Sequence, residues 1–442
     1  MSGLFFTTQY LMFWKFFNKS VDKPSISNMS KSGSKTRLPL EYLQKLIPIG
    51  ELPVDELQTL VATLRSFNPG EIIFNRGDTA DELTYLYTGE VYLEAINGNG
   101  YSVEDSTFKA CYPLSTNTEH QFSAIAKSKV NIVYFPLSTL KRGATAAYVN
   151  NPLISIRAVP LEIRYCDLFV GFCKAFRKDE LRVPSLPDIA LRLRSALQKE
   201  VNFSDVVKII NLDPVISSKL IQVVNSPIYR TLHSITNIHD AIYRLGLKTT
   251  QNLVTTISLY NLFQSKNKRL NDYIHQIWKQ SIHVASLSST LASCSYKINP
   301  DEALLAGLIH NIGALPIITF AESLDDTKYS QQQLDLTIAT LQGLVGIYIL
   351  KKWHFPESLQ HIPNQANNWY YDVNPALQLS DIVLLARFHN ELGNGQMQKL
   401  PPLNTLPAFL KLGNNSLTPD MSLQALRDAK HQIEEAMTLF KI

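Results

Sequence analysis

Residues 306–317, AGLIHNIGALPI, carry two adjacent polar side chains, His310 and Asn311, among apolar and small residues. We expect this stretch to be one buried helix, closed by Gly313. An imidazole is a good ligand for a transition metal, and a carboxylate beside it would make a stronger site. Asn311 offers an amide instead, and such a site needs three or four ligands with supporting partners. Whether the dipeptide does chemistry therefore depends on what the rest of the chain places beside it.

Other reactive residue types lack the companions that chemistry would need. His283, His354 and His361 form no metal-type spacing with a carboxylate, and we interpret them as surface or packing residues. No glycine-rich phosphate loop follows an expected strand, and no G-x-S-x-G nucleophile motif is present. The four cysteines have no paired or zinc-type spacing, which favours reduced, buried thiols: Cys111, Cys166, Cys173 and Cys294.

The elements that would position His310 are expected to be helices from residue 183 onward. Apolar residues recur at helical spacing after Ser185, Ser204 and Asp213, each of which is a candidate N-terminal cap. Two further helices are expected on either side of Gly246. Short connections between many helices favour an α-helical bundle.

Three runs in this region, VPSLPDIALRLRSALQ, IINLDPVISSKLIQVVNSPIY and ITNIHDAIYRLGLKTTQNLV, resemble an HDOD domain in their order and spacing. This family is a regulatory relative of the HD-GYP and HD phosphohydrolases, and the resemblance covers about residues 182–386. Catalytic relatives hold metal with a His-Asp dipeptide and further histidines. The resemblance places other residues there: Gln280, His310, Asn311 and Gln342, then Ala366-Asn367, with Asp381 loosely at a later acidic position. It implies a degenerate site without catalytic residues, metal or cofactor, in which His310 is a hydrogen-bonded structural residue.

The preceding part of the chain has a different pattern. Residues 38–67 contain two helical patterns, the second formed by Leu57, Leu60, Val61 and Leu64. Short β-rich runs follow at residues 71–74, 83–87, 91–95, 121–126 and 130–135, with turn signals between them, including residues 97–100. Helices followed by closely spaced strands favour a small antiparallel roll or barrel.

Residues 68–95, NPGEIIFNRGDTADELTYLYTGEVYLEA, resemble the opening half of a cyclic-nucleotide-binding domain. Gly70, Gly77 and Gly89 stand where that family places its turns, and the resemblance covers about residues 38–142.

The ligand site of that family does not carry over. The resemblance implies an arginine for the cyclic phosphate and a Gly-Glu pair for the ribose, but residues 109–126 contain neither Arg nor Gly. His120 falls where the arginine belongs, and Tyr112-Pro113 replaces Gly-Glu. We therefore expect a roll kept for docking or dimerisation. Lys109, His120 and Lys127 remain candidates for a vestigial anion or nucleotide pocket.

The composition, 45% hydrophobic and 18% charged over 442 residues, predicts a folded protein of two or three domains. The fold class we expect is an α+β multidomain protein, with an N-terminal antiparallel β-roll followed by an all-α HDOD bundle. The expected divisions are a tail and flexible linker (1–37), the roll (38–142), a connecting helical segment (143–182), the HDOD domain (183–386) and a C-terminal helical extension (387–442). One helix each is expected over residues 161–177 and 423–440.

Residues 4–17, LFFTTQYLMFWKFF, are aromatic but too short and too interrupted for a membrane-spanning helix, and they lack signal-peptide features. Contact of this segment with a membrane surface stays open.

Three functions follow as hypotheses. The first is a non-catalytic bacterial signalling scaffold in the cytoplasm, a degenerate sensor or docking roll coupled to an HDOD protein-interaction domain. Its partners would be signalling proteins, and a homodimer stays open. The second is a metal-dependent phosphodiesterase acting on a cyclic nucleotide or dinucleotide. The third, a nucleic-acid-binding regulator, is disfavoured because the net charge is only +4 and the basic residues are dispersed.

Overall fold

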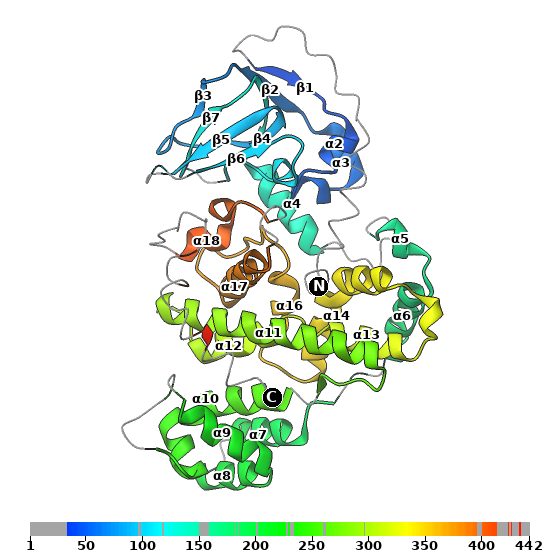
Figure 1. Cartoon of the computed structure of the whole chain (residues 1–442), viewed down its shortest axis with the longest axis vertical. Helices are drawn as coiled ribbons and strands as arrows, with labels where there is room; N and C mark the ends of the chain where they lie inside the picture. The colour runs from blue at the N-terminus through cyan, green and yellow to red at the C-terminus, as the bar shows by residue number, and fades with distance from the viewer. Residues whose placement is uncertain are drawn as a thin grey trace. The chain divides into compact units, whose positions relative to one another are not determined.

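A computed structural model describes most of the chain between residues 33 and 412, and a few residues beyond (Figure 1). The described residues are 33–95, 98, 100–116, 119–149, 159–181, 183, 185–199, 202–226, 229, 234–259, 262–295, 297–395, 400–412, 423, 426 and 433–434. The aromatic segment 4–17, part of the expected turn at 97–100 and most of the expected helix 423–440 lie outside them.

The chain divides into two compact units. The first contains residues up to 151 together with 368–377 and 391–423, and the second contains residues 152–367, 378–390 and 424–442. This division differs from the sequence-based one, because residues 368–377 of the expected HDOD domain and residues 391–423 of the expected extension group with the N-terminal strands.

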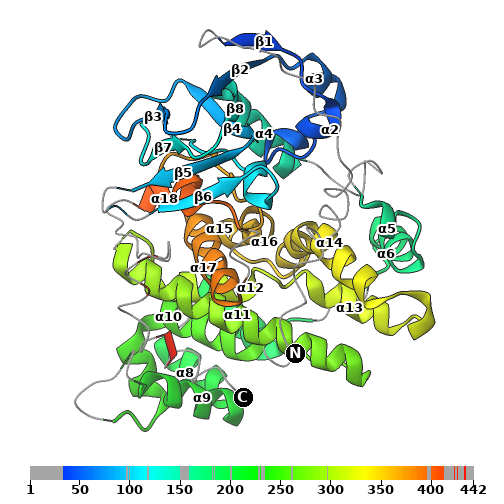
Figure 2. The same cartoon turned by 45° about the horizontal axis from the view of Figure 1, so that its top comes forward.

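The first unit contains two four-stranded antiparallel sheets among the described residues (Figure 2). One has the order β1 (Ser34–Thr36), β2 (Ala62–Phe67), β8 (Val130–Pro136), β4 (Glu82–Thr88). The other has the order β3 (Ile72–Phe74), β7 (Ser123–Ala126), β5 (Glu90–Glu94), β6 (Gly100–Glu104). Short helices accompany them: α2 (Leu40–Leu43), η1 (Ile49–Glu51), α3 (Val54–Thr59), η2 (Phe108–Cys111) and α4 (Ser138–Val149). We call residues 33–149 the β-roll; the expected antiparallel architecture is confirmed.

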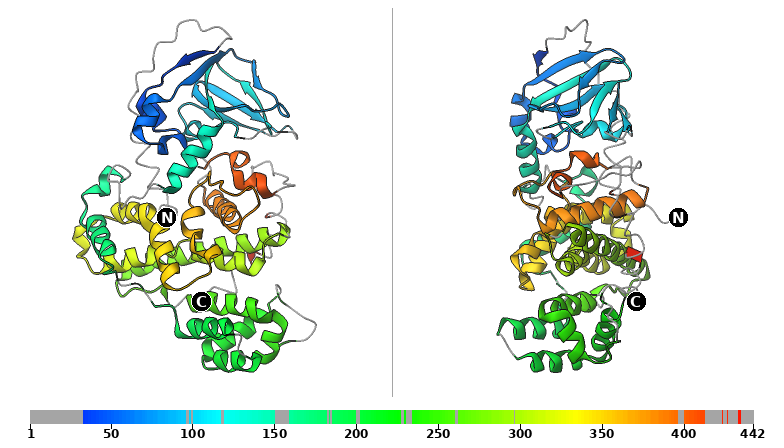
Figure 3. Two further views of the ribbon diagram at one scale, coloured as in Figure 1. Left: turned by 180° about the vertical axis from the view of Figure 1, so that it is seen from behind. Right: turned by 90° about the vertical axis from the view of Figure 1, so that its left-hand side faces the viewer.

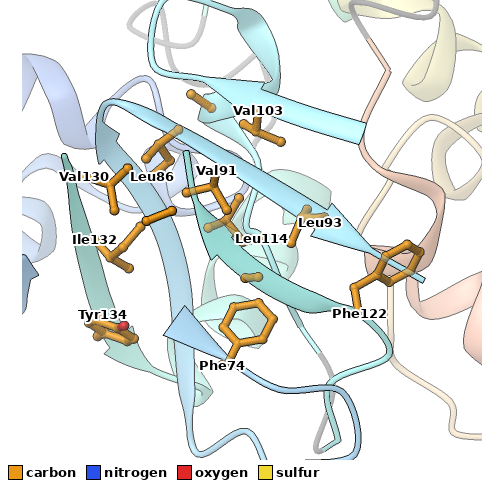
Figure 4. Packing of buried hydrophobic residues seen from close by; sticks show 13 residues of the cluster. Phe74, Leu86, Val91, Leu93, Val103, Leu114, Phe122, Val130, Ile132 and Tyr134 are labelled. Atoms are coloured by element: carbon orange, nitrogen blue, oxygen red, sulfur yellow. The ribbon is translucent and has the colours of Figure 1, made fainter. Parts of the chain in front are cut away.

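The core of the β-roll comes from alternating residues of both sheets (Figure 4). On β5, Val91 and Leu93 are fully buried while Tyr92 between them faces the other side of the sheet. Val130 and Ile132 on β8 and Phe74 on β3 complete the same cluster. Burial of every second residue is typical of a strand that packs one face against the core.

Two expectations for the β-roll were wrong. The helical pattern assigned to Leu57–Leu64 ends with α3 at Thr59, and Ala62 begins strand β2, which pairs with β8. Within the expected flexible linker, Ser34–Thr36 pairs with β2 as an edge strand. In both places pairing with a distant strand overrides the local pattern.

The second unit is helical (Figure 3). Its helices are α5 (Leu161–Arg164), α6 (Asp167–Arg177), α7 (Asp188–Gln198), α8 (Phe203–Asn211), α9 (Pro214–Val224), α10 (Ile238–Leu259), α11 (Lys268–Ser295), α12 (Pro300–Ile309), α13 (Ala314–Glu322), α14 (Gln331–Lys352), α15 (Glu357–Gln360), α16 (Ile362–Gln365) and most of α17 (Leu379–Gly393). Helices α7 to α10 pack on one another, and α11 packs along α12. We call this unit the helical domain; the all-α prediction is confirmed.

Local signals set several of these boundaries. The Asp213 carboxylate accepts hydrogen bonds from the Val215 and Ile216 N–H groups at the start of α9, as a capping residue should. Gly246 has φ of 77° and separates the two expected helices that together form α10. Ser185 and Ser204 do not cap α7 and α8, whose capping positions are Pro187 and Asn202.

The single helix expected over residues 161–177 is interrupted. Cys166 takes the N-cap position of α6, and its sulfur accepts a hydrogen bond from the Phe169 N–H. Helices α5 and α6 pack against α14.

Two stretches in the described residues are long and apolar enough to cross a membrane, Pro300–Glu322 and Gln331–Lys352. Most of the apolar part of each lies buried inside the helical domain. Core helices of a domain have this composition as well.

Candidate functional site

The His310-Asn311 dipeptide lies in a turn, which corrects the expectation of one continuous helix over residues 306–317. Helix α12 ends at Ile309, and α13 begins at Ala314. The turn between them is held by i to i+3 hydrogen bonds, from Ile312 N–H to the Ile309 carbonyl and from Ala314 N–H to the Asn311 carbonyl. His310 and Asn311 are both buried.

Glycines allow the neighbouring helices to approach this turn closely. A Cβ on Gly307 would lie 2.5 Å from the Cα of Ala285 on α11. A Cβ on Gly313 would lie 1.9 Å from the backbone oxygen of Gln342 on α14. The turn is therefore fixed between α11 and α14 by backbone-to-backbone packing that a larger residue would prevent.

His310 is held as a neutral histidine. Its Nδ1 lies 2.5 Å from the Gly307 carbonyl oxygen, and since a carbonyl only accepts, Nδ1 carries the proton. Burial lowers the pKa of His310 to about 4, and the positive charge of Arg387 acts in the same direction. The imidazole therefore stays uncharged at neutral pH, as the structural interpretation of this residue requires.

Helix α17 contributes polar residues that the sequence reasoning assigned to an extension outside the site. Arg387 donates from Nη1 to the Ala366 carbonyl at 2.9 Å, and its charge acts on His310. Asn390 lies one turn further and its Oδ1 is 2.6 Å from Nδ1 of His283 on α11. The signal that could have shown this is the i, i+3 spacing of Arg387 and Asn390, which places both on one helix face.

The two glutamines at the other expected ligand positions are placed differently. Gln342 is buried, and its Oε1 has no hydrogen-bond partner among the described residues. Gln280 is half-exposed on α11. The structure thus brings the backbone of Gln342 against the His310–Gly313 turn, and in the described part of the chain no hydrogen bond ties Gln280 to it.

The donor set near His310 does not fit a metal pair. Among the described residues, no group of three or more His, Cys, Asp or Glu side chains could hold a metal ion. The buried carboxylates have other roles: Asp381 accepts from the Gln378 N–H at the start of α17, and Asp335 accepts from the Tyr273 hydroxyl. Amides and one neutral imidazole bind divalent metals weakly, because charge-bearing ligands are missing.

Each of the three candidate anion-binding residues of the β-roll packs against a different aromatic ring. His120 stacks on Phe74 at 3.8 Å and shares a hydrogen bond with Ser115, and burial lowers its pKa. Lys109 lies 4.9 Å from the ring centre of Tyr101, and Lys127 lies 5.0 Å from that of Tyr92.

The two aromatic partners belong to opposite faces of one sheet. Tyr101 pairs with the buried Leu93, whereas Tyr92 pairs with the exposed Ser102. Lys109 and Lys127 therefore stand on different faces.

Fold and site together define an α+β protein whose helical domain holds a buried, uncharged His310 next to Asn311. Residues 183–368 match the HDOD domain family, and this part of the chain is an HDOD domain.

The helical domain is similar to a solved protein from Shewanella amazonensis SB2B whose name places it among the metal-dependent phosphohydrolases. The two are 28% identical with a TM-score of 0.54, over 61% of this chain and 98% of that one. An uncharacterised protein of Treponema pallidum (strain Nichols) is 27% identical over 190 residues, which are 40% of this chain. The chain spans only 36% of the length of that relative.

For the N-terminal region, one similar solved structure is named as a cyclic nucleotide-binding protein from Geobacter metallireducens GS-15. It is 21% identical, with a TM-score of 0.21, over 24% of this chain and 83% of that one. The antiparallel architecture of the β-roll follows from its own strand pairing and not from this similarity.

Proposed function

We propose that the protein is a non-catalytic signalling scaffold, in which the HDOD domain binds a partner protein and the β-roll serves as a sensor or docking domain. One observation carries the proposal: the position where catalytic relatives have an acid next to the histidine holds Asn311, beside a neutral His310 tied to the Gly307 carbonyl. A metal-bound hydroxide needs a strongly Lewis-acidic centre, and this donor set gives little to hold one.

The proposal extends to partners and place of action. The partners are signalling proteins of bacterial regulation in the cytoplasm, and neither nucleic acid nor a transmembrane anchor is part of it. A homodimer is compatible with the proposal, as is contact of residues 4–17 with a membrane surface.

Coupling between the units would run through α17. The chain passes from the helical domain to the first unit within this helix, at residues 390 and 391. Such coupling requires two states to which a ligand or partner binds unequally.

Metal binding and turnover test the proposal. The purified full chain would be titrated with Mn²⁺ and Zn²⁺ by calorimetry, and then assayed for hydrolysis of a cyclic dinucleotide and of cyclic AMP. We expect no metal-dependent turnover and equal weak metal binding by wild type and His310→Ala. Turnover that His310→Ala abolishes would contradict the scaffold.

The alternative, a metal-dependent phosphodiesterase of the HD superfamily, rests on the name of the Shewanella relative. This function requires metal ligands other than Gln280, His310, Asn311 and Gln342. Matched variants separate the two functions: His310→Ala removes the imidazole, while His354→Ala removes an exposed one. A phosphodiesterase would respond to the first and ignore the second.

A further inference from the structure

A C-terminal segment of the chain lies against the β-roll within the first unit. Residues 400–412, which we call the strap, contain η7 (Leu403–Thr405) and α18 (Pro407–Leu412). Every residue from 400 to 409 is buried. In Figure 4 the faint orange-red ribbon of the strap region passes beside Phe122 and the end of the second sheet.

Specific hydrogen bonds tie the strap to the β-roll. The Thr116 hydroxyl donates to the Thr405 carbonyl at 2.7 Å, and both residues are buried. The Tyr101 hydroxyl donates to Oδ1 of Asn404 at 3.3 Å. Thr116 belongs to residues 109–126, the region in which the sequence suggested a lost ligand pocket.

A second segment of the same unit, residues 368–377, also contacts the strap. The Thr405 hydroxyl donates to the Pro402 carbonyl, so the Tyr370 hydroxyl 3.1 Å away is the donor to Thr405. Lys411 forms an ion pair with Asp372 at 3.1 Å, and its side chain is only 8% exposed.

The strap has the periodicity of a docking peptide. Leu400, Leu403, Leu406 and Phe409 recur at every third residue, and all four are buried. Three residues per turn is the repeat of 3₁₀ and polyproline II structure, so over η7 this spacing places apolar side chains on one side, while the residues between them are buried as well.

The strap is nevertheless not a strand of the β-roll. Pro401, Pro402 and Pro407 have no N–H to donate, and within the described residues the strap's backbone-to-backbone hydrogen bonds are local. Both sheets are complete without it. The strap joins the β-roll through the Thr405 carbonyl and the Asn404 side chain, and no strand pairing is involved.

We propose that the β-roll has a peptide-docking surface around Tyr101 and Thr116, and that its resident occupant is the strap of the same chain. The strap keeps the surface closed and is released as a unit. This regulates the docking role of the β-roll and in that respect rests on the proposed scaffold function. If the strap proved to be a fixed part of the fold, the proposed scaffold function would still stand. Metal binding and turnover test the helical domain and not the strap.

A labelled peptide of residues 399–412 tests the proposal on full-length chains. An attached segment has an effective concentration on the order of 1 mM, so wild type should exclude the peptide at ~10 μM. A release variant, Leu403→Asp with Leu406→Asp, should bind it at least tenfold more tightly in fluorescence anisotropy. Adding Thr116→Val and Tyr101→Phe to the release variant should reduce binding again.

Two controls keep the test decisive. Val373→Asp introduces the same charge at a site of the first unit that is 70% exposed, and it should behave as wild type. Circular dichroism and limited proteolysis report whether the β-roll of the release variant stays folded. A release variant that is unfolded, or folded but no better at binding peptide than wild type, would overturn the proposal. So would a wild-type dimer that the release variant cannot form, because the strap would then bind a second copy.

Discussion

The His310 turn of the helical domain and the strap surface of the β-roll are held by different kinds of contact. Around His310 the space is closed by backbone contacts at Gly307 and Gly313, with an uncharged histidine inside. In the β-roll, Thr116 instead bonds to Thr405, 289 residues further along the chain.

The difference matters for what each region can still do. Close helix packing does not open without unfolding the helices involved, since interiors are packed like crystals. A segment that belongs to neither sheet can leave and return while both sheets persist. We therefore expect rigidity in the helical domain and exchange in the β-roll.

The largest effect we expect is from Gly313→Ala. The added methyl would meet backbone atoms of Gln342 and Gly346, at 1.9 and 2.6 Å, which cannot move without shifting α14. Overpacking against backbone should destabilise the helical domain by about 3 kcal/mol. Denaturant unfolding followed by helical circular dichroism measures it.

Gly393→Ala is the matched control, because a Cβ there meets nothing within 4 Å. It should change stability by no more than ~1 kcal/mol, in the stabilising direction. Equal losses of stability in Gly313→Ala and Gly393→Ala would contradict the close packing of the His310 turn.

Next in size is the pH dependence that His310 produces. Its pKa is about 4 when folded and 6.5 when exposed, so the unfolded chain holds the proton more tightly between these values. The stability is fully present above pH 6.5 and is lost as the pH falls toward 4. Between pH 7 and pH 5 the loss should be about 2 kcal/mol, at ~1.4 kcal/mol per unit.

His310→Gln isolates this contribution from other titrating groups. In urea titrations the free energy of unfolding of wild type should fall between pH 7 and pH 5. That of the variant should lack the His310 part of this fall. An unchanged slope would mean that the imidazole is not buried as a neutral group.

The sequence predicts those parts of the fold that depend on local pattern. Asp213 before Pro214 is a complete capping signal, and Gly246 marks the kink in α10, because each acts through its own backbone. The alternating residues of β5 likewise define a strand with one buried face.

Features that depend on contacts between distant residues could not be predicted from the sequence. The break after Ile309 begins four residues before its local breaker Gly313, so the apolar pattern alone placed the end of the helix too late. Strand β2 follows a helical pattern and becomes a strand by pairing with β1 and β8. For the strap, nothing near Thr405 in the sequence indicates Thr116 as its partner.

Thr116→Val should have a smaller effect and one confined to the β-roll. The substitution removes the hydroxyl donor while keeping the shape, and leaves the buried Thr405 carbonyl without it. We expect a loss of about 1–2 kcal/mol in the stability of the first unit. Amide hydrogen exchange in residues 400–409 should accelerate at the same time, with α12 and α13 unaffected.

Thr59→Val is the matched control, since the Thr59 hydroxyl donates to the Glu56 carbonyl at an exposed site. It should change stability by less than ~0.5 kcal/mol and leave exchange in the strap unchanged. Faster exchange in α12 and α13 in the Thr116 variant would contradict separate behaviour of the two regions.

The smallest effect should come from Lys127→Ala. Lys127 is exposed on the face of the second sheet that carries Tyr92, away from Tyr101 and the strap. Losing its contact with the ring should cost no more than ~0.5 kcal/mol and should not alter binding of the strap peptide to the release variant. Lys109→Ala, on the Tyr101 face, should weaken that binding, because Lys109 holds the ring whose hydroxyl contacts Asn404. Equal losses in both variants, measured by the same anisotropy titration, would mean that the docking surface is defined by positive charge and not by one face of the sheet.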